Sequence, residues 1–286
     1  MSPDALLSGG STILRGSQAA TIALGLLLTA LPMCCQTNPP PKPAEEEFEN
    51  ESNPTQTVFL SVRNQYFNRS EDDWTNALVI RSDRIFMRKH KRLGGKTGLL
   101  TRFDVPVVIS EVGGMTHAGL GDLYAQALHV PWLTPRFAVA LGSGITIPTA
   151  THRTLGGGKW VAAPLLAPVW FFPERKGFFF VKLQQFVSFA GPSDRRDLNY
   201  LLSTPTLVYR FHPRWWVGAD TEVKTDWEQD NHVSFRSGLE IGHVVKPHLA
   251  LAVKLEVPWG AHREAAPSVP GDWALKLILT RYRRRD

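Results

Sequence analysis

Long stretches in which apolar and polar side chains alternate one by one constrain this chain more than any other feature. Between residues 137 and 148, Phe137, Val139 and Leu141 point to one side of an extended chain, and Ala138 and Ala140 point to the other. This two-residue period is that of a β-strand with two different faces. The stretches run for roughly 11–15 residues, whereas strands of soluble proteins average about 5–6 and a tilted membrane-spanning strand needs about 9–11. Their length therefore favours strands that cross a membrane.

About twelve such stretches follow residue 57, and none of that region has a convincing helical period. They cover roughly residues 58–68, 75–88, 98–110, 121–133, 136–149, 159–172, 177–191, 198–212, 214–226, 231–245, 247–258 and 271–283. The mean hydropathy of −0.14 is too low for a bundle of membrane helices. With 10% aromatic and 20% charged residues, the chain is not a disordered one either. We therefore predict an all-β protein, an antiparallel up-and-down transmembrane β-barrel of about 12 strands.

The links between these stretches alternate in length. Short links, each with a proline, lie at residues 134–135, 173–177, 212–214 and 246–247, and longer ones lie at 149–159, 191–197, 226–231 and 259–271. Outer-membrane barrels have short periplasmic turns and long external loops, and an even strand number places both chain ends on the periplasmic side. The link at 88–97 is an exception, because it falls on the short-turn side yet is long and basic.

Tryptophans lie near the ends of the predicted strands, where amphipathic rings settle at the two surfaces of a bilayer. They are Trp74, Trp132, Trp160, Trp170, Trp215, Trp259 and Trp273. The alternative is a secreted, soluble β-sandwich, in which the polar face of each strand would be the outer one.

The first residues have the composition of an export signal. Residues 19–33 form a charge-free apolar run, which has the length of the apolar region of a secretory signal and is short for a spanning helix. Cys34 follows directly and is a candidate for lipidation, while an uncleaved anchor is a third option. Residues 36–57 are rich in proline and glutamate, which predicts a solvated linker. We thus expect a signal or targeting segment at 1–35, a disordered linker at 36–57 and an outer-membrane barrel at 58–286.

If the apolar face of each strand contacts lipid, the opposite face lines the interior of the barrel. That face carries charges of both signs, which must pair or stay hydrated because an isolated buried charge is costly. The candidate interior residues are Arg63, Arg81, Asp83, Arg102, Asp104, Lys182, Arg210, Asp220, Glu222, Lys224, Arg236, Glu240, Lys254, Glu256 and Lys276. We favour a lattice of ion pairs that largely fills the interior over a wetted polar conduit, and for each residue a structural ion pair over a substrate contact.

Three short motifs in the middle of the chain belong together. Gly119, Gly121 and Asp122 form a GxGD sequence at the start of a predicted strand, a later strand ends in Ile147, Pro148 and Thr149, and a glycine-rich loop with Gly156 and Gly158 precedes Lys159 and Trp160. In these motifs the chain resembles a family of bacterial outer-membrane barrels that is named for transport in the meta-pathway of phenol degradation. The resemblance is strongest over residues 119–172.

The resemblance implies an outer-membrane location, contact with outer-membrane lipid, and passage of small hydrophobic or aromatic molecules. It leaves the permeant and the oligomeric state open. Two features depart from the family: Tyr282 is followed by a basic tail instead of closing the chain with an aromatic residue, and Cys34 would be an unusual lipidation site for a barrel.

Other chemistry has weaker support in the sequence. His232 and Ser234 are of the right types for a rim hydrolase, but nothing else indicates an activated serine. Asp220 and Glu222 are better explained by ion pairing than by acid–base catalysis. His117, His152 and His262, in predicted external loops, could at most capture a surface metal. We predict no enzyme, no cofactor and no metal site, and the scattered basic residues behind the net charge of +6 do not indicate nucleic acid.

Three classes of function therefore remain. The first is an outer-membrane channel, the second is a closed structural barrel or one that interacts through its surface loops, and the third is a rim hydrolase or a secreted soluble β protein.

Overall fold

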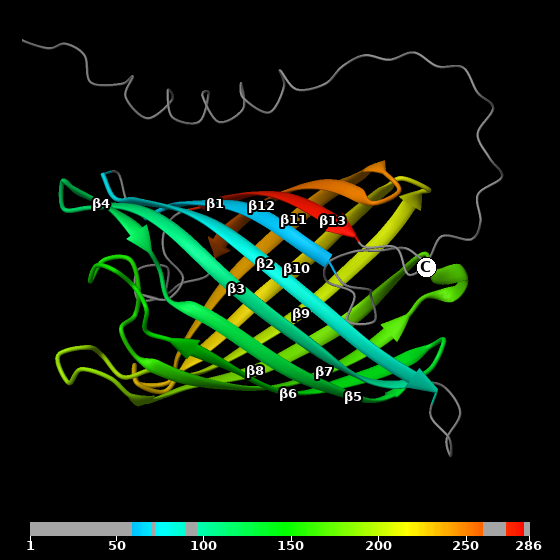
Figure 1. Ribbon diagram of the computed structural model, residues 1–286, viewed down its shortest axis with the longest axis horizontal. Coiled ribbons are helices and arrows are strands. Elements are labelled where there is room, and N and C mark those ends of the chain that lie inside the picture. The colour runs from blue at the N-terminus through cyan, green and yellow to red at the C-terminus, as the bar shows by residue number, and fades with distance from the viewer. Residues whose placement is uncertain (1–58, 70–71, 90–95, 260–272, 283–286) are drawn as a thin grey trace, which may run out of the picture. The chain divides into compact units, whose positions relative to one another are not determined.

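The strand pairing closes into a ring in the computed structural model (Figure 1). The structure describes residues 59–69, 72–89, 96–259 and 273–282. The predicted signal segment at 1–35, the predicted linker at 36–57 and Cys34 lie outside the described residues, so these assignments stay predictions. Among the residues described, no helix has the length and apolar character needed to cross a membrane.

The described chain is almost entirely strand. The strands are β1 (Phe59–Asn68), β2 (Trp74–Lys89), β3 (Lys96–Val112), β4 (Met115–Leu120), β5 (Leu123–Leu133), β6 (Phe137–Ile147), β7 (Trp160–Phe171), β8 (Gly177–Ala190), β9 (Asn199–His212), β10 (Trp215–Asp226), β11 (His232–Lys246), β12 (Leu249–Trp259) and β13 (Trp273–Tyr282). A single turn of 3-10 helix, η1 (Pro173–Arg175), forms the short link between β7 and β8.

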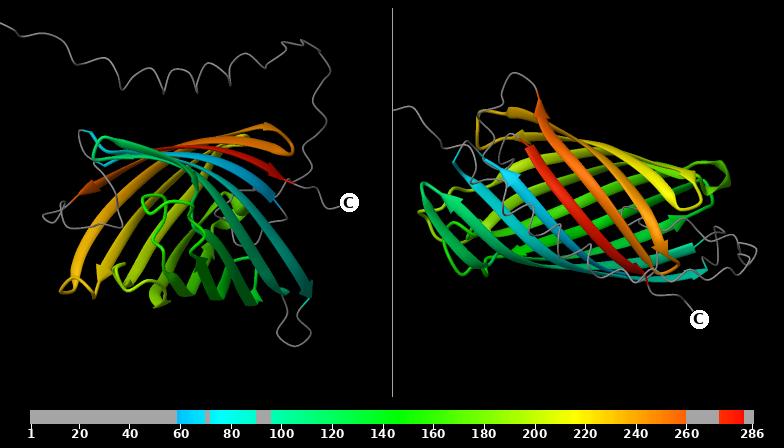
Figure 2. Two further views of the ribbon diagram at one scale, coloured as in Figure 1. Left: turned by 60° about the vertical axis from the view of Figure 1, so that its left-hand side comes forward. Right: turned by 90° about the horizontal axis from the view of Figure 1, so that it is seen from above.

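Twelve of these strands form the ring, and each is antiparallel to both of its neighbours. β1 pairs with β2 on one side and with β13 on the other, so the last strand returns to the first and no edge is left open. The views in Figure 2 show the strands running obliquely around the wall. The predicted fold, a closed antiparallel barrel of about 12 strands, is confirmed.

The thirteenth strand, β4, was not predicted. Among the described residues it pairs only with the far end of β3, from which it is separated by Gly113 and Gly114, both with positive φ. Two glycines in this conformation form a tight hairpin turn whose twist suits the flanking strands. Gly121 and Asp122 then interrupt the pairing, and β5 continues along β3 toward the short-link end. The predicted strand at 121–133 is therefore the second half of a longer, interrupted one.

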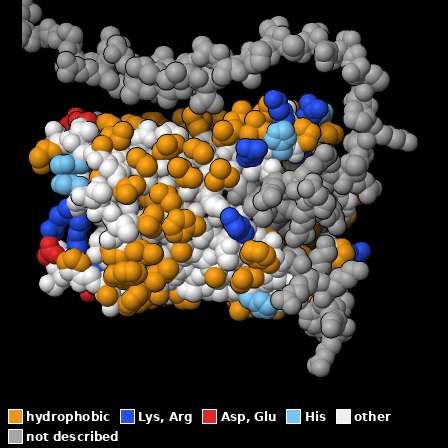
Figure 3. All heavy atoms as spheres, viewed as in Figure 1, with side chains coloured by type: hydrophobic (Ala, Val, Ile, Leu, Met, Phe, Trp, Pro, Cys, Tyr) orange, Lys and Arg blue, Asp and Glu red, His pale blue; other side chains and the backbone are white. Residues whose placement is uncertain are grey.

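The outer wall is apolar over its middle. Leu78 and Ile80 on β2, and Leu251 and Val253 on β12, are each more than a third exposed, and Figure 3 shows hydrophobic side chains across much of the visible wall. Because a soluble protein would bury such a surface, a wall of this kind indicates contact with lipid.

Aromatic rings gather at both ends of this apolar band. Near the short links, the rings of Trp132, Phe137, Trp170 and Phe179 contact one another in sequence across β5 to β8. Near the long links, Tyr66 packs against Trp74 and Trp273, and Phe235 stacks on Trp259. Two girdles with an apolar band between them are the expected outer surface of a membrane barrel.

Candidate functional site in the barrel interior

All fifteen predicted interior residues occupy the inward positions of their strands. The register shows this directly, because inward neighbours face each other across every pair, for example Arg81 with Asp104 and Glu222 with Arg236. Most of these inward charges form one layer, about midway between the short and the long links, which we call the ionic layer. Arg210, opposite Trp216 near the short links, and Lys224, nearer the long links, lie outside it.

On β2 and β3 the ionic layer consists of two parallel ion pairs. Arg81 donates two hydrogen bonds to Asp104, of 2.7 and 2.6 Å. One step nearer the short links, Arg102 donates to both carboxylate oxygens of Asp83, which is only 1% exposed. Because each guanidinium meets its carboxylate through two hydrogen bonds, the geometry of both pairs is fixed as well as their charge.

On β10 to β13 the ionic layer is a connected network around one carboxylate. Glu256, 1% exposed, accepts from Lys276 and from Lys254, and Arg236 lies 3.5 Å from its second oxygen. Lys254 also reaches past β11 to Asp220 on β10, at 2.6 Å. That contact joins strands that are not neighbours, and the place between them is taken by Gly238, which has no side chain in the way.

A further buried pair lies nearer the long links. Lys224 donates to Asp226 at 2.7 Å, and both side chains are 3% exposed. The ammonium also lies 4.5 Å from the centre of the Tyr200 ring, and Arg196 approaches Asp226 from the loop. Asp226 is not among the predicted interior residues, although it lies two positions after Lys224 on the same inward face of β10.

Aromatic side chains also lie in the part of the interior nearer the long links. Phe186 stacks on Tyr200 with ring centres 4.7 Å apart, and the Tyr124 hydroxyl accepts a hydrogen bond from Gln184. Any side chain at Gly144 would collide with the Tyr124 ring, so this glycine provides the room for it.

Between the ionic layer and the short links, most buried inward side chains are apolar. Two clusters, which we call the apolar collar, together reach around the barrel near the short links. Their buried members are Ala138, Val169, Phe178, Val208, Trp216, Ala250, Ala252, Ile278 and Tyr282 in one, and Ile85, Leu100, Leu128, Val130, Ala140, Leu165 and Ala167 in the other. The premise that apolar residues face lipid and polar residues face inward is therefore wrong at this end, because both faces are apolar there.

Trp216 connects the collar to the ionic layer. Its ring, 3% exposed, packs over Gly242 on β11, and its Nε1 donates to Glu240 at 2.8 Å. A buried indole needs a partner for its N–H, and Glu240 provides one while remaining in the ionic layer. The sequence predicts that Trp216 and not Trp215 points inward. Trp216 is an even number of residues away from the inward charges Asp220 and Glu222 on the same strand.

The motif residues at 119–160 build a loop that is held together by hydrogen bonds. The Asp122 carboxylate accepts from the backbone N–H of Ala150, Gly157 and Gly158, at 3.1, 2.6 and 3.3 Å. Thr149 donates to the carbonyl of Gly121 and accepts from the amide of Leu123. These bonds hold the link between β6 and β7 against the break between β4 and β5.

The same loop is fastened to the link between β8 and β9. Lys159, which is buried, pairs with Asp197 at 2.8 Å, and Arg153 pairs with Asp194 at 2.6 Å. The hydrogen bond from Lys159, followed by that from Ser188, lowers the pKa of Asp197, and the bond from Arg153 lowers the pKa of Asp194. Lys159 therefore has an ion-pairing role in this loop.

The structure also locates the residues considered for a hydrolase, for acid–base catalysis and for metal capture. The Ser234 hydroxyl is buried on the inward face and makes no hydrogen bond there, so His232 does not activate it. Asp220 is held by Lys254. His117 and His152 stack with ring centres 3.6 Å apart, and the described residues contain no group of three or more His, Cys, Asp or Glu that could hold a metal ion. His262 lies outside the described residues.

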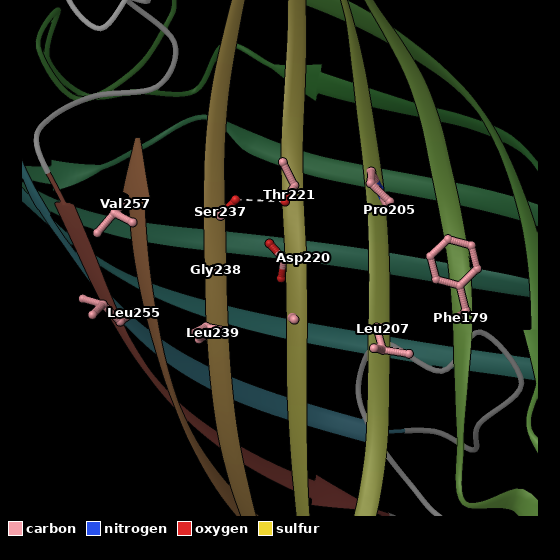
Figure 4. A pocket seen from close by; sticks show the side chains of 11 residues that line it. Phe179, Pro205, Leu207, Asp220, Thr221, Ser237, Gly238, Leu239, Leu255 and Val257 are labelled. Atoms are coloured by element: carbon pink, nitrogen blue, oxygen red, sulfur yellow. Dashed lines mark hydrogen bonds between the residues drawn. The ribbon is translucent and has the colours of Figure 1, made fainter. Parts of the chain in front are cut away.

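A groove with a volume of about 470 Å³ lies on the outer wall between β8 and β12 (Figure 4). Leu207, Leu239 and Leu255 line the groove. Gly238 and the hydroxyl-bearing residues Thr221 and Ser237 line it as well. The hydroxyls of Thr221 and Ser237 bond to each other, and Trp259 donates to Ser237. Polar groups that face lipid must be satisfied within the protein, and here they are.

No protein-family model matches the chain, and no curated protein does either. Several solved structures are similar at a low level. The KdgM porin is 11% identical with a TM-score of 0.46, covering 79% of this chain and all of the porin. OccK11 of Pseudomonas aeruginosa is 11% identical with a TM-score of 0.34, covering 78% and 94%. Outer membrane phospholipase A from Escherichia coli is 8% identical with a TM-score of 0.43, covering 84% and 96%. Similarity at this level assigns neither family nor function.

Proposed function

We propose that this chain is a bacterial outer-membrane channel for small hydrophobic or aromatic molecules. The membrane location is supported by the apolar outer wall between two aromatic girdles, since closed barrels with such walls are the β-structures that span membranes. The predicted export signal agrees with that location. The resemblance in residues 119–172 stays a prediction that rests on its motif residues alone.

The apolar collar is the observation that carries the proposed permeant class. An ion or a sugar must lose hydrogen bonds with water where the interior is lined by Phe178, Trp216 and Ile278, while a small apolar molecule loses none. Most charges of the adjacent ionic layer are engaged in ion pairs, so most of that layer presents a neutralised surface to such a molecule. The second candidate, a closed barrel that interacts through its loops, is favoured by the same ion pairs and by the fastened links at 148–159 and 191–198.

Gel mobility and conductance separate these candidates. The membrane-extracted protein should migrate differently when boiled and unboiled, because a closed barrel resists detergent. In planar bilayers we expect a small potassium chloride current that benzamide, a neutral aromatic, interrupts in proportion to its concentration. Phe178→Ala should enlarge the current, and Phe189→Ala, which removes the same ring from the outer wall, should not. Absence of current in both the native chain and Phe178→Ala would establish the closed barrel instead.

A further inference from the structure

Two of the fifteen interior residues stand apart from the ion-pair network. Among the described residues, Lys182 and Glu222 form neither a hydrogen bond nor an ion pair within 4.0 Å, although their opposite charges act on each other. Glu222 has a second basic neighbour, because it faces Arg236 directly across β10 and β11. Lys182 has no such second partner.

Lys182 differs from the neighbouring cations. Arg81, Arg102 and Lys254 are each engaged with a carboxylate, namely Asp104, Asp83 and Asp220. Among the described residues, no carboxylate lies within 4.0 Å of the Lys182 ammonium, although the charge of Glu222 acts on it. An anion beside Lys182 would therefore meet a cation that is not already engaged in an ion pair.

A buried hydroxyl lies next to this ammonium without a partner. Thr204 faces Lys182 directly across β8 and β9 and points inward, is 7% exposed, and its Oγ1 has no hydrogen-bond partner among the described residues. Because a buried hydroxyl is costly to leave unpaired, it needs an acceptor at this place. A carboxylate oxygen suits both the hydroxyl donor and the ammonium donor.

Aromatic rings lie above and below this pair of donors. Along the inward face of β8, Phe180 is one step toward the short links from Lys182, and Phe186 is two steps toward the long links, where it stacks on Tyr200. A ligand that joins a flat apolar ring to a carboxylate could place its charge on Lys182 while its ring contacts one of these neighbours.

We infer that Lys182 and Thr204 form a binding site inside the barrel for a small aromatic carboxylate. This inference rests on the proposed channel function and concerns the ionic layer, where the carboxylate of the ligand is held outside the apolar collar. Lys182 provides the charge recognition, Thr204 donates the second hydrogen bond, and Phe180 or Phe186 with Tyr200 receives the ring. A neutral aromatic of the same size fits the same space but leaves the hydroxyl and the ammonium less well satisfied.

Calorimetric titration of the full-length protein in detergent tests the site without requiring conduction. The probes are benzoate, benzamide as its neutral counterpart, and acetate as a carboxylate without a ring. We expect benzoate to bind at least about tenfold more tightly than either of the others, as a charge-assisted hydrogen bond and ring contact require. Equal affinities for benzoate and benzamide would overturn the anion site, and equal affinities for benzoate and acetate would overturn the ring contact.

Variants assign the effect to the two residues. Lys182→Gln should weaken benzoate binding about tenfold and leave benzamide within about twofold, Thr204→Val should weaken benzoate by about threefold, and Lys182→Arg should retain most of the affinity. Lys246→Gln, at the exposed end of β11, is the matched control and should change nothing. Heat-dependent gel mobility confirms that each variant is folded. Unchanged benzoate binding in Lys182→Gln refutes the inference, whereas Lys182-dependent binding in a barrel that carries no current refutes the channel and leaves the site standing.

Discussion

The apolar collar and the ionic layer are both built from inward-facing residues of the barrel strands, but they lie at different heights and fill the barrel with opposite chemistry. The collar excludes water from side chains such as Phe178 and Val169, and its stability comes from buried area and dispersion contacts. The ionic layer buries Glu256 and Asp83 to a similar degree, but each buried charge depends on a particular partner. In this barrel, the alternation along a strand determines whether a side chain points inward or outward. Whether an inward side chain is apolar or charged depends on its position along the barrel axis.

The difference predicts that the collar is the more costly layer to damage by removing a single side chain. Phe178→Ala should lower the free energy of unfolding by about 4 kcal/mol, because it leaves a cavity among side chains that cannot collapse around a closed ring. The loss should be the same at low and high salt. Denaturant-induced unfolding from lipid vesicles measures it, and a salt-dependent loss would show that the collar depends on the charges above it.

In the ionic layer, removal of one partner should be costly and removal of both should not. Asp104→Asn leaves Arg81 buried without its counter-charge and should cost about 3 kcal/mol. The double variant Arg81→Met with Asp104→Leu replaces the pair by apolar groups and should recover most of that loss. If the double variant is no more stable than the single one, the ion pair itself stabilises the barrel, and the two layers differ less than we infer.

Outside the two layers, the fastened loop depends on one carboxylate. Asp122→Ala removes the acceptor for three backbone N–H groups and should cost about 2 kcal/mol. Protease cleavage within residues 148–159 should become faster, while the barrel strands stay protected. Equal cleavage rates in Asp122→Ala and the native chain would show that the loop is held by Lys159 and Asp197 alone.

The smallest effect is expected from acid. The pKa of Asp194 and that of Asp197 are lower in the folded protein than the value of about 3.9 for a free aspartate, so their contribution is complete above that pH and is lost as the pH falls through the folded values. Hydrogen exchange of residues 191–198, corrected for the intrinsic rate, should accelerate below about pH 4. In Asp197→Asn this pH dependence should be weaker, because only the Asp194 pair remains to titrate.

Much of the fold follows from local patterns in the sequence. The alternation of Val217 and Ala219 with Asp220 and Glu222 is set by the geometry of a strand, and proline in the short links sets where strands turn, so strand number and direction could be predicted. The β3–β4 hairpin could not, because Gly113 and Gly114 are followed by only six residues of strand before the next break.

The partners inside the barrel follow from register between distant strands, which no local pattern contains. Lys254 reaches Asp220 across β11 only because Gly238 lies between them, and Trp216 finds Glu240 only because Gly242 makes room. The apolar collar was missed for a related reason: where both faces of a strand are apolar, as around Phe178, the sequence gives no sign of which face is inside.

The placement of the ion pairs also bears on how such a chain can be assembled. Arg81, Asp83, Arg102 and Asp104 lie on two consecutive strands, and the network around Glu256 lies on β10 to β13. Each of these two groups can therefore form its ion pairs within one contiguous piece of sheet, before the first and last strands meet. In a nascent sheet built in this order these pairs can form before ring closure, which then brings the ring of Phe67 on β1 next to the ammonium of Lys276 on β13.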